Sequence, residues 1–375
     1  MRIALDVAAA LDGASGLGFY VERIAAALVA AGPEHEFVLT AAFWTGAERL
    51  AAAALPRGPN VSRLRLAAPQ RLLLPAEEVA GLRWRERNLL ARGVDAYLGL
   101  GNVLPPLVQL PGVVVVHHVG GELPPGLWPR FFFETLPARS ARRAERVIAV
   151  SEHTRARAID AWGLEARRVT TVLEGGPDSL FRATTAATNS VTPYVLHVGA
   201  LVARKNISGL LRAFAQIIER DPARPLRLVL AGRPGDASAE IARLASQPPL
   251  SGRVEILGSV ARERLVALYQ GAAAVVVPSL LEGFGFPVLE AMACGAPVVA
   301  AHASSLPEVA GDAALLCDAS RPEALATALS RVLEEPDFAA ELRRRGPARA
   351  ASFSWAESAR RTLDVVVEAR AAKKS

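Results

Sequence analysis

Short apolar runs alternate with amphipathic stretches along most of the chain, beginning at the amino terminus. After the apolar run at 2–7, a helical stretch at about 19–31 carries Val21, Ile24 and Leu28 on one face. Residues 76–91 form a charged, amphipathic pattern that predicts another helix. Further apolar runs of strand length lie at 36–40, 95–98, 113–117, 146–150 and 169–172. This alternation predicts parallel β-α-β units with helices on both faces of a sheet.

The alternation stops at residues 181–193 and then begins again. These residues are rich in Thr, Ala and Asn and have no periodicity, so we expect a linker there. A chain of 375 residues also exceeds what one ordinary hydrophobic core holds. Strands are predicted after the linker at 194–198, 226–231, 254–257, 273–277 and 297–300. We therefore predict an α/β protein with doubly wound, Rossmann-like domains at 1–180 and 194–354 and a terminal helix at 355–375.

The composition is that of a globular protein, with 51% hydrophobic and 21% charged residues. No apolar run approaches the ~18 residues that a membrane span needs. Arg2 and Asp6 interrupt the amino terminus before the apolar region of a signal peptide can develop. Cys294 and Cys317 are too few for a disulfide framework, and neither has a nearby partner at metal-ligand spacing. We therefore expect a cytoplasmic protein.

The net charge is +6, from 43 Lys and Arg against 37 Asp and Glu, and it is not gathered into long runs. A solvated basic surface explains it, and attraction to anionic ligands or to a membrane surface is the alternative. No basic helix is interleaved with stacking aromatics, so we expect no nucleic-acid binding. The segments Trp128–Phe133 and Arg83–Arg85 bring aromatic and basic residues into the first half, and for the phenylalanine run 131–133 we favour core packing. An acceptor groove or a shallow membrane contact is the alternative for these residues.

The most specific pattern is the nine-residue segment Glu282–Glu290, which is followed by Gly-Ala-Pro-Val-Val at 295–299. Pro287 suits the first position of a helix, and Gly283 and Gly285 let backbone approach a ligand closely. The N–H groups and positive end of that helix form an anion site suited to a pyrophosphate. Glu282 and Glu290 would repel phosphates, so they suit the hydroxyl groups of ribose and sugar. A glycine-rich turn with a capping glutamate is the structural alternative.

A second pattern follows the predicted strand that ends at Val198. Gly199 opens a loop that leads to the adjacent cations Arg204 and Lys205 before the next helix. At the carboxyl end of a strand, such a pair supplies charge-assisted hydrogen bonds to phosphate oxygens. An ordinary solvated surface is the alternative. No Asp-x-Asp follows a strand, and no His/Cys cluster is present, so we expect no metal requirement.

Two weaker patterns lie in the first half. Gly16 and Gly18 form a Gly-x-Gly loop, which is commonly a tight turn. It is not a complete dinucleotide fingerprint, because Val21 stands where the third glycine belongs. His117 ends the strand at 113–117, where a histidine is often a hydrogen-bonded core residue. Ser151 is interpreted as the N-cap of a helix.

The segment Glu282–Glu290 resembles the EX7E signature of retaining glycosyltransferases of family 4, which have the GT-B fold. The resemblance extends over most of the chain and is clearest at 194–325. It implies two Rossmann-like domains that face a central cleft, with the nucleotide mainly on the carboxyl-terminal domain and the acceptor on the other. It also implies that the terminal helix crosses back onto the first domain.

The resemblance assigns roles to the residues that match the family's motifs. Glu290 would contact the nucleotide ribose, and Glu282 and His117 would lie against the donor sugar. Arg204 and Lys205 would hold the diphosphate, approached by Gly199 and by the loop of Gly16 and Gly18. His118 stands where the family commonly has aspartate. The residues whose amides would hold sugar and phosphate are Gly283, Phe284, Gly285, Phe286, Pro287 and Val288.

The implied activity is metal-independent transfer of a sugar from a nucleotide-sugar, with retention of anomeric configuration. GDP-mannose is the first donor expected, because residues 304–318 and the region of His117 resemble mannosyltransferase-like members. UDP- and ADP-sugars are the alternatives, and the acceptor is a glycan, a lipid-linked oligosaccharide or a small molecule. Two other functions stay open. One is a nucleotide-sugar epimerase or hydrolase on the same fold, and the other is a non-catalytic sugar-nucleotide-binding protein.

Overall fold

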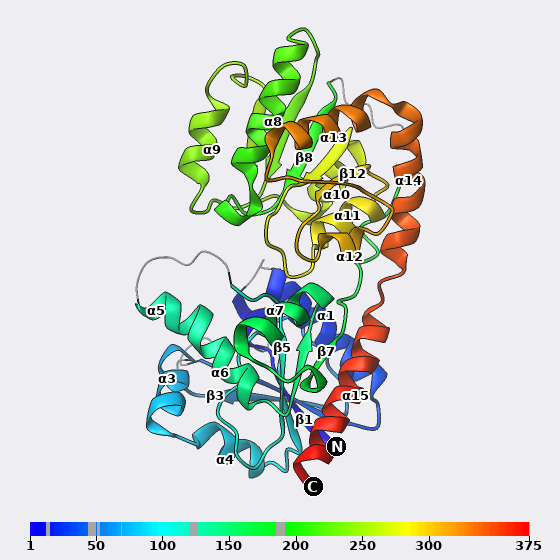
Figure 1. The fold of residues 1–375 in the computed structure, drawn as a ribbon. Coiled ribbons are helices and arrows are strands. Elements are labelled where there is room, and N and C mark those ends of the chain that lie inside the picture. Colours follow the sequence, from blue (N-terminus) through cyan, green and yellow to red (C-terminus); the bar gives the residue numbers. More distant parts are fainter. Residues whose placement is uncertain are drawn as a thin grey trace. The chain divides into compact units, whose positions relative to one another are not determined.

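The computed structural model describes residues 1–12, 16–43, 50, 53–68, 70–120, 127–184 and 192–374. The chain forms two compact units, which are visible in Figure 1. Unit 1 comprises Met1–Gly175 and Ser354–Ser375, and unit 2 comprises Gly176–Phe353. The chain therefore changes units before the expected linker at 181–193, of which 185–191 lie outside the described residues. Gly175, the last residue before the change, packs in unit 1 against the ring of Trp355.

Unit 1 contains a seven-stranded sheet in the order β3-β2-β1-β4-β5-β6-β7. All neighbouring strands are parallel, so their carboxyl ends lie at one edge of the sheet. The strand β5 is buried throughout, as in sheets covered on both faces. The strands are β1 (Arg2–Asp6), β2 (Glu36–Ala42), β3 (Val61–Leu66), β4 (Ala96–Gly99), β5 (Gly112–Val116), β6 (Arg146–Ala149) and β7 (Val169–Thr171).

Helices surround this sheet. They are α1 (Gly16–Ala31), α3 (Gln70–Ala80), α4 (Trp84–Leu90), α5 (Leu127–Arg130), α6 (Leu136–Arg143), α7 (Glu152–Trp162) and α15 (Trp355–Lys374). Shorter helical segments are η1 (Ala8–Asp12), the π-helical turn η2 (Phe131–Thr135) and η3 (Ala166–Arg168). Ser151 caps α7 as expected, because its side chain accepts from the N–H of Thr154. The single helix expected at 76–91 is wrong, since Gly81, at φ +64°, follows the end of α3.

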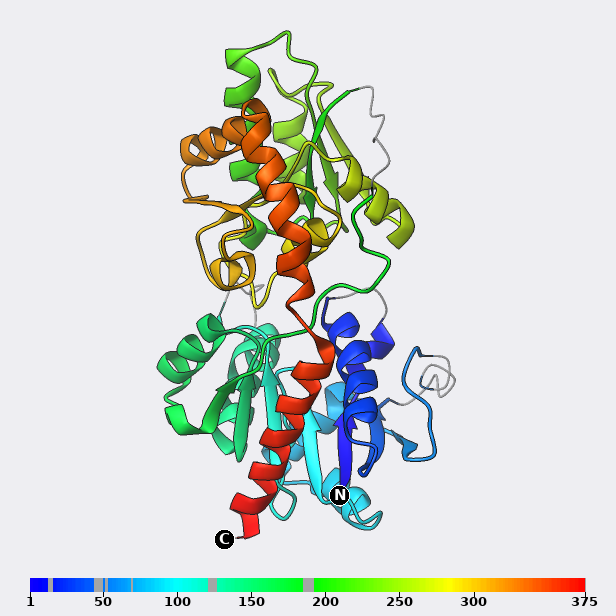
Figure 2. The same cartoon turned by 90° about the vertical axis from the view of Figure 1, so that its right-hand side faces the viewer.

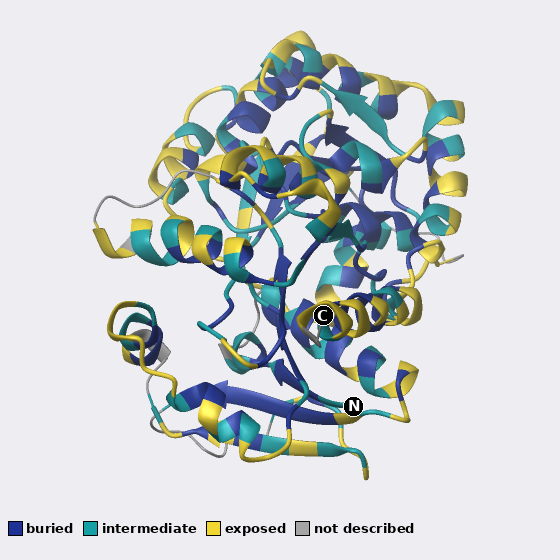
Figure 3. Cartoon of the chain, turned by 60° about the horizontal axis from the view of Figure 1, so that its bottom comes forward, coloured by how far each residue is buried: buried dark blue, intermediate teal, exposed yellow. Residues whose placement is uncertain are grey.

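The terminal helix α15 packs beside α1, as Figure 2 shows for the lower part of the molecule. The ring of Trp355 lies 6.2 Å from Phe19 and 5.8 Å from Tyr20, centroid to centroid. Near its other end, Arg370 donates to the Asp95 carboxylate over 2.6 Å. These contacts fasten the end of the chain to unit 1. Figure 3 shows the central strands of this unit buried and the helices exposed on their outer faces, whereas edge strand β3 is partly exposed.

Unit 2 contains a six-stranded parallel sheet in the order β10-β9-β8-β11-β12-β13. Its strands are β8 (Tyr194–Val198), β9 (Arg227–Ala231), β10 (Val254–Gly258), β11 (Ala274–Val277), β12 (Val298–Ala301) and β13 (Leu315–Cys317). Its helices are η4 (Ala203–Lys205), α8 (Ile207–Arg220), α9 (Ser238–Ala245), α10 (Arg262–Gly271), α11 (Phe286–Ala293), α12 (Leu306–Ala310), α13 (Pro322–Glu334) and α14 (Pro336–Ala351). Both units are thus the parallel α/β layers that the alternation predicts.

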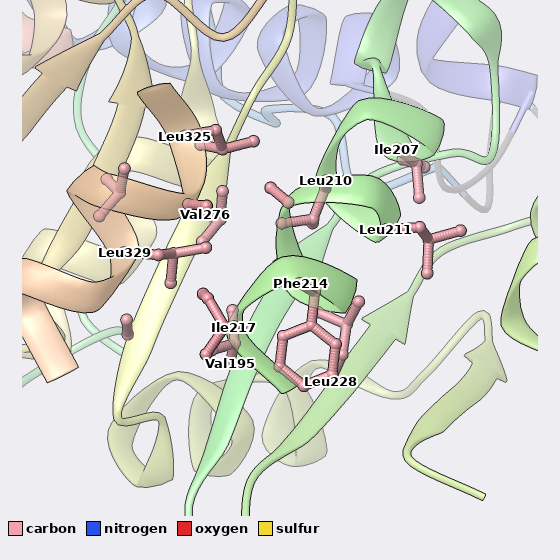
Figure 4. Packing of buried hydrophobic residues seen from close by; sticks show 14 of the residues in the cluster. Val195, Ile207, Leu210, Leu211, Phe214, Ile217, Leu228, Val276, Leu325 and Leu329 are labelled. Carbon is pink, nitrogen blue, oxygen red and sulfur yellow. The ribbon is translucent and has the colours of Figure 1, made fainter. Parts of the chain in front are cut away.

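The core of unit 2 forms between α8, α13 and the sheet (Figure 4). Helix α8 buries residues 207, 210, 211, 214, 217 and 218, the spacing of one helical face. Phe214 and Ile217 pack in the cluster with Val195, Leu228 and Leu329. Among the described residues, no helix is long and apolar enough to cross a bilayer.

Phe214→Ala is expected to lower the free energy of unfolding of unit 2 by about 3–5 kcal/mol, because it removes a fully buried ring and leaves a cavity. Urea denaturation followed by circular dichroism measures the change. Ile256→Ala, at a position 40% exposed in the same unit, is the control and should cost clearly less. Equal losses for the two variants would contradict the assignment of Phe214 to the core.

Candidate functional site

The candidate site in unit 2 is built from the loops that follow β8 and β11. These strands are parallel neighbours, so both loops leave the same edge of the sheet. The first loop carries Gly199, Arg204 and Lys205, and the second carries Glu282. A backbone hydrogen bond ties the loops together, since the N–H of Leu280 donates to the Arg204 carbonyl oxygen over 2.9 Å.

A buried ion pair joins the two loops. Lys205 and Glu282 are each only 7% exposed, and the Lys205 ammonium donates to Glu282 Oε1. Arg204 is more exposed, and its Nη1 lies 3.4 Å from Glu282 Oε2 and 3.1 Å from the Leu281 carbonyl oxygen. Burial raises the pKa of Glu282, but Lys205 and then Arg204 outweigh burial and leave this pKa below its usual value. Glu282 is therefore a carboxylate at neutral pH.

Serines from a third loop, after β12, fix the backbone around Glu282. The N–H of Glu282 donates to Ser304 Oγ over 2.9 Å. Ser305 Oγ is fully buried and lies 3.1 Å and 2.7 Å from the carbonyl oxygens of Glu282 and Phe284, which share its hydrogen. Three successive strand ends along the sheet thus contribute to one rigid arrangement.

The segment after Glu282 leads into α11 with the geometry expected of a helix start. Gly285 occupies the N-cap at φ +125°, a conformation that favours glycine, and Pro287 lies in the first turn. Phe284 is buried, and its ring packs edge-on against Phe286 at 5.5 Å. The positive end of the helix dipole therefore begins a few residues after Glu282. Val288 is buried on the inner side of α11.

Gly199 is also held close to this pair. Its φ is +155°, and a Cβ there would lie 3.3 Å from His197 Nε2 and 3.5 Å from Lys205 Cε. His197 itself is fully buried, with Nδ1 3.0 Å from the Val276 carbonyl oxygen. Burial lowers the pKa of His197 to about 4, so this imidazole is neutral at pH 7.

Glu290, the other glutamate of the motif, has different surroundings. It lies on α11, and the buried Tyr269 of α10 donates to its Oε2 over 2.8 Å. Burial raises the pKa of Glu290 to about 7, against the hydrogen bond from Tyr269 and the charge of Arg262. The two glutamates of one motif thus differ in charge state because only Glu282 has an adjacent ammonium.

In unit 1, His117 is held by neighbours on both sides of its ring. Its Nδ1 lies 3.0 Å from the carboxylate of the buried Glu174, and its Nε2 lies 2.9 Å from the Leu100 carbonyl oxygen. A carbonyl oxygen only accepts, so Nε2 carries a hydrogen. The ring of Tyr20 packs edge-on at 4.5 Å, and His118 is exposed. The carboxylate beside His117 therefore comes from Glu174, which the sequence analysis missed.

Two expectations in unit 1 are corrected by the structure. Gly16 and Gly18 lie in the first turn of α1, which begins at Gly16, so they do not form the expected loop, although 13–15 lie outside the described residues. Core packing is wrong for the phenylalanine run, because Phe133 is 63% exposed and Phe131 and Phe132 are only partly buried, beside Trp128 at 66% exposed. The ring of Trp128 instead stacks on Phe132 at 6.0 Å, beside the π-helical turn.

The basic segment Arg83–Arg85 divides between surface and core. Arg83 is exposed, whereas Arg85 is only 2% exposed. Arg85 Nη2 lies 3.2 Å from Glu77 Oε2, and Arg85 Nη1 lies 3.4 Å from the Tyr97 hydroxyl. Arg85 therefore joins α4 to α3 and to the sheet.

Comparison with known proteins identifies the family. Residues 185–349 match the model of "Glycosyl transferases group 1", and residues 15–175 match that of a "Glycosyl transferase 4-like domain". The second match covers much of unit 1 and the first covers most of unit 2. The chain therefore belongs to the group 1 glycosyl transferases.

Curated relatives are similar over part of their length. O-antigen chain mannosyltransferase B of Escherichia coli is 33% identical over 59% of this chain and 60% of that protein. D-inositol 3-phosphate glycosyltransferase of Rhodococcus opacus (strain B4) is 32% identical over 58% of this chain and 51% of that protein. The chain thus spans between half and two thirds of the length of these two relatives.

Solved structures share the fold over nearly the whole chain. Sucrose-phosphate synthase from Thermosynechococcus elongatus superimposes with a TM-score of 0.74 and 22% identity, covering 99% of this chain and all of that one. HepE of Anabaena, solved with UDP and glucose, gives a TM-score of 0.73 and 19% identity, covering 98% of this chain and all of that one. These likenesses establish the GT-B type of fold, with two Rossmann-like parallel-sheet units.

Lys205→Met is expected to destabilise unit 2 by about 3 kcal/mol, because it leaves the buried Glu282 carboxylate with a weaker partner. Adding Glu282→Gln to Lys205→Met should recover much of that loss. Urea denaturation of the two single variants and the double variant measures the coupling energy between the two side chains. The pKa of Glu282 is lower in the folded protein than in the unfolded chain. The ion pair therefore contributes fully to the free energy of unfolding at pH values above the pKa of Glu282 in the unfolded chain. This contribution is lost as the pH falls through the pKa of Glu282 in the folded protein. Additive losses in the two single variants would contradict the pairing.

Proposed function

We propose that the protein transfers a sugar from a nucleotide-sugar donor to a glycan, a lipid-linked oligosaccharide or a small-molecule acceptor. The observation that carries the proposal is the pair of cations Arg204 and Lys205, held by Glu282 beside the start of α11. Two cations and a helix amino terminus at one sheet edge attract a diphosphate. The carboxylates Glu282 and Glu290 near it accept hydrogen bonds from hydroxyl groups.

In the proposed reaction the bond between the sugar C1 and the diphosphate oxygen breaks while C1 bonds to an acceptor oxygen. Arg204 and Lys205 neutralise the charge that develops on the departing nucleoside diphosphate, the role that a metal ion plays in other enzymes. A phosphate oxygen of the leaving group takes the acceptor's proton. The acceptor then attacks from the face that the diphosphate leaves, which gives retention of configuration without a covalent intermediate.

The other side chains orient the donor. Glu290 accepts from the ribose, Glu282 accepts from a sugar hydroxyl, and the amides of 283–288 hold sugar and phosphate. His117 has both ring nitrogens engaged by Glu174 and Leu100. A hydrogen bond from His117 to the sugar therefore requires Nε2 to exchange the Leu100 carbonyl oxygen for a sugar hydroxyl.

We propose GDP-mannose as the donor, with UDP- and ADP-sugars as alternatives. The proposal is supported by the similarity to a protein named an O-antigen chain mannosyltransferase. The HepE structure in complex with UDP and glucose supports UDP-sugars instead. Each donor offers the same diphosphate and ribose to Lys205 and Glu290, so the base and the sugar decide between them.

A lipid-linked acceptor would bring the protein to a membrane surface from the cytoplasm. Exposed apolar side chains in unit 1 include Leu127 at 86%, Trp128 at 66% and Phe133 at 63%. Arg130, also exposed, lies among them in the sequence. Aromatic and basic side chains of this kind bind the interface of anionic bilayers, so we propose peripheral contact through this segment.

A thermal-shift panel of GDP-, UDP-, ADP- and dTDP-sugars with EDTA present tests the donor class. One nucleotide should raise the melting temperature most, because a ligand that binds the native state stabilises it by an amount that grows with the logarithm of its excess over Kd. Arg204→Ala should abolish most of that shift. Arg212→Ala is the matched control, since Arg212 is an exposed arginine of the same unit that pairs with Glu240.

The same donor should be consumed only when an acceptor is supplied, which product analysis by mass spectrometry follows. Consumption without acceptor would favour an epimerase or a hydrolase. No shift with any donor would refute the proposed site. A shift that requires added Mg²⁺ would refute the metal-independent mechanism.

A further inference from the structure

Tyr269 is a buried side chain that the proposed mechanism does not use. It lies on α10, is 0% exposed and donates its hydroxyl hydrogen to Glu290 Oε2 over 2.8 Å. Burial raises the pKa of Tyr269 well above its usual value, and the nearby Glu290 raises it further. Tyr269 therefore stays neutral and remains a hydrogen-bond donor across the physiological pH range.

The position of the Tyr269 ring is fixed by the segment that opens unit 2. The ring of Phe181 packs edge-on against Tyr269 at 6.1 Å. The Arg262 guanidinium lies 5.6 Å above Phe181 and forms an ion pair with Asp178. The neighbouring Gln270 donates to the Arg182 carbonyl oxygen over 2.8 Å. Helix α10 is thus anchored on both sides of Tyr269, which holds the hydroxyl at Glu290.

We propose that Tyr269 is a positioning residue for ribose recognition, which sets the orientation of the Glu290 carboxylate toward the hydroxyls of the nucleotide. The inference rests on the proposed function, because it assigns the ribose to Glu290. A carboxylate has about four acceptor positions, and Tyr269 occupies one of those on Oε2. The rotation of the carboxylate is then fixed, and its remaining acceptor positions are aligned before the nucleotide binds.

The charge of Glu290 follows from the groups that face it. Tyr269 and Arg262 face it from α10, Asp178 from the segment that opens unit 2, and Cys294 from the C-cap of α11. With a pKa raised to about 7 by burial, the empty protein holds this carboxyl partly protonated near neutrality. Ribose hydroxyls donate to the ionised form, so nucleotide affinity should fall as pH drops below about 7. Loss of the Tyr269 hydroxyl raises this pKa further and moves the fall to higher pH.

Tyr269→Phe tests the inference through binding of the nucleoside diphosphate of the preferred donor, measured by calorimetry between about pH 6 and 8.5. The variant should lose about tenfold in affinity at neutral pH. The midpoint of the fall in affinity with pH should lie at a higher pH in the variant than in the parent protein. The 2′,3′-dideoxynucleoside diphosphate should bind the variant and the parent protein equally, because it has no hydroxyls for Glu290. Glu290→Gln should remove the part of the pH dependence that the ribose form shows and the dideoxyribose form lacks.

Tyr194→Phe is the matched control. Tyr194 is another buried tyrosine of unit 2, and its hydroxyl donates to the Leu268 carbonyl oxygen over 2.8 Å, away from the Glu290 carboxylate. This variant loses one buried hydrogen bond of the same kind, so its free energy of unfolding should fall about as much as that of Tyr269→Phe. It should nevertheless keep the parent protein's preference for the ribose form over the dideoxyribose form. A general loosening of α10 would weaken the binding of both nucleotides equally, and it would do so in both variants.

The outcomes separate the inference from the proposed function. If the parent protein binds no nucleoside diphosphate, the proposed function is wrong. If the parent protein binds and Tyr269→Phe binds both nucleotides with unchanged affinity and pH midpoint, the positioning role is wrong and the proposed function stands. Equal losses for the ribose and dideoxyribose forms would also overturn the positioning role.

Discussion

The buried ion pair between Lys205 and Glu282 is the constraint on which the candidate site depends. Both charges are 7% exposed, and they come from loops that follow the neighbouring strands β8 and β11. Burying either charge alone would cost several kcal/mol, about the stability of a small domain. The two loops are therefore stable at this edge only when they meet. Their meeting also brings Arg204 to Glu282, in the loop that leads into α11.

This arrangement offsets part of the positive charge of the candidate anion site, because one carboxylate faces two cations. Glu282 occupies the cations that the proposed reaction needs for the diphosphate, so a bound nucleotide must compete with it. Displacement of Lys205 and Arg204 toward the phosphates would in turn release the Glu282 oxygens for a sugar hydroxyl. A similar arrangement occurs in unit 1, where the carboxylate of Glu174, in the segment after β7, contacts Nδ1 of His117. In both units a carboxylate from another strand end fixes the side chain assigned to the donor.

The sequence predicted the parts of the fold whose signals are local. Buried parallel strands such as β5 are continuous apolar runs, and α8 has one apolar face, so periodicity predicted both. Edge strand β3 was missed because VSRLRL alternates apolar and polar residues and so lacks the continuous apolar run by which the buried strands were predicted. Edge strand β13 was missed because LLC is very short. Motif spacing led to Arg204, Lys205 and Glu282. It did not lead to Glu174 or Tyr269, because their partners lie 57 and 21 residues away along the chain.

The most direct test of this account is the affinity of a nucleoside diphosphate, without sugar, for Glu282→Gln compared with the parent protein. Calorimetry at low ionic strength measures it. The account predicts tighter binding by the variant, by roughly tenfold, because the amide no longer neutralises Lys205 and Arg204. Transfer of sugar by the same variant should be lost. Weaker binding of the diphosphate by Glu282→Gln would contradict the account, because Glu282 would then support the anion rather than compete with it.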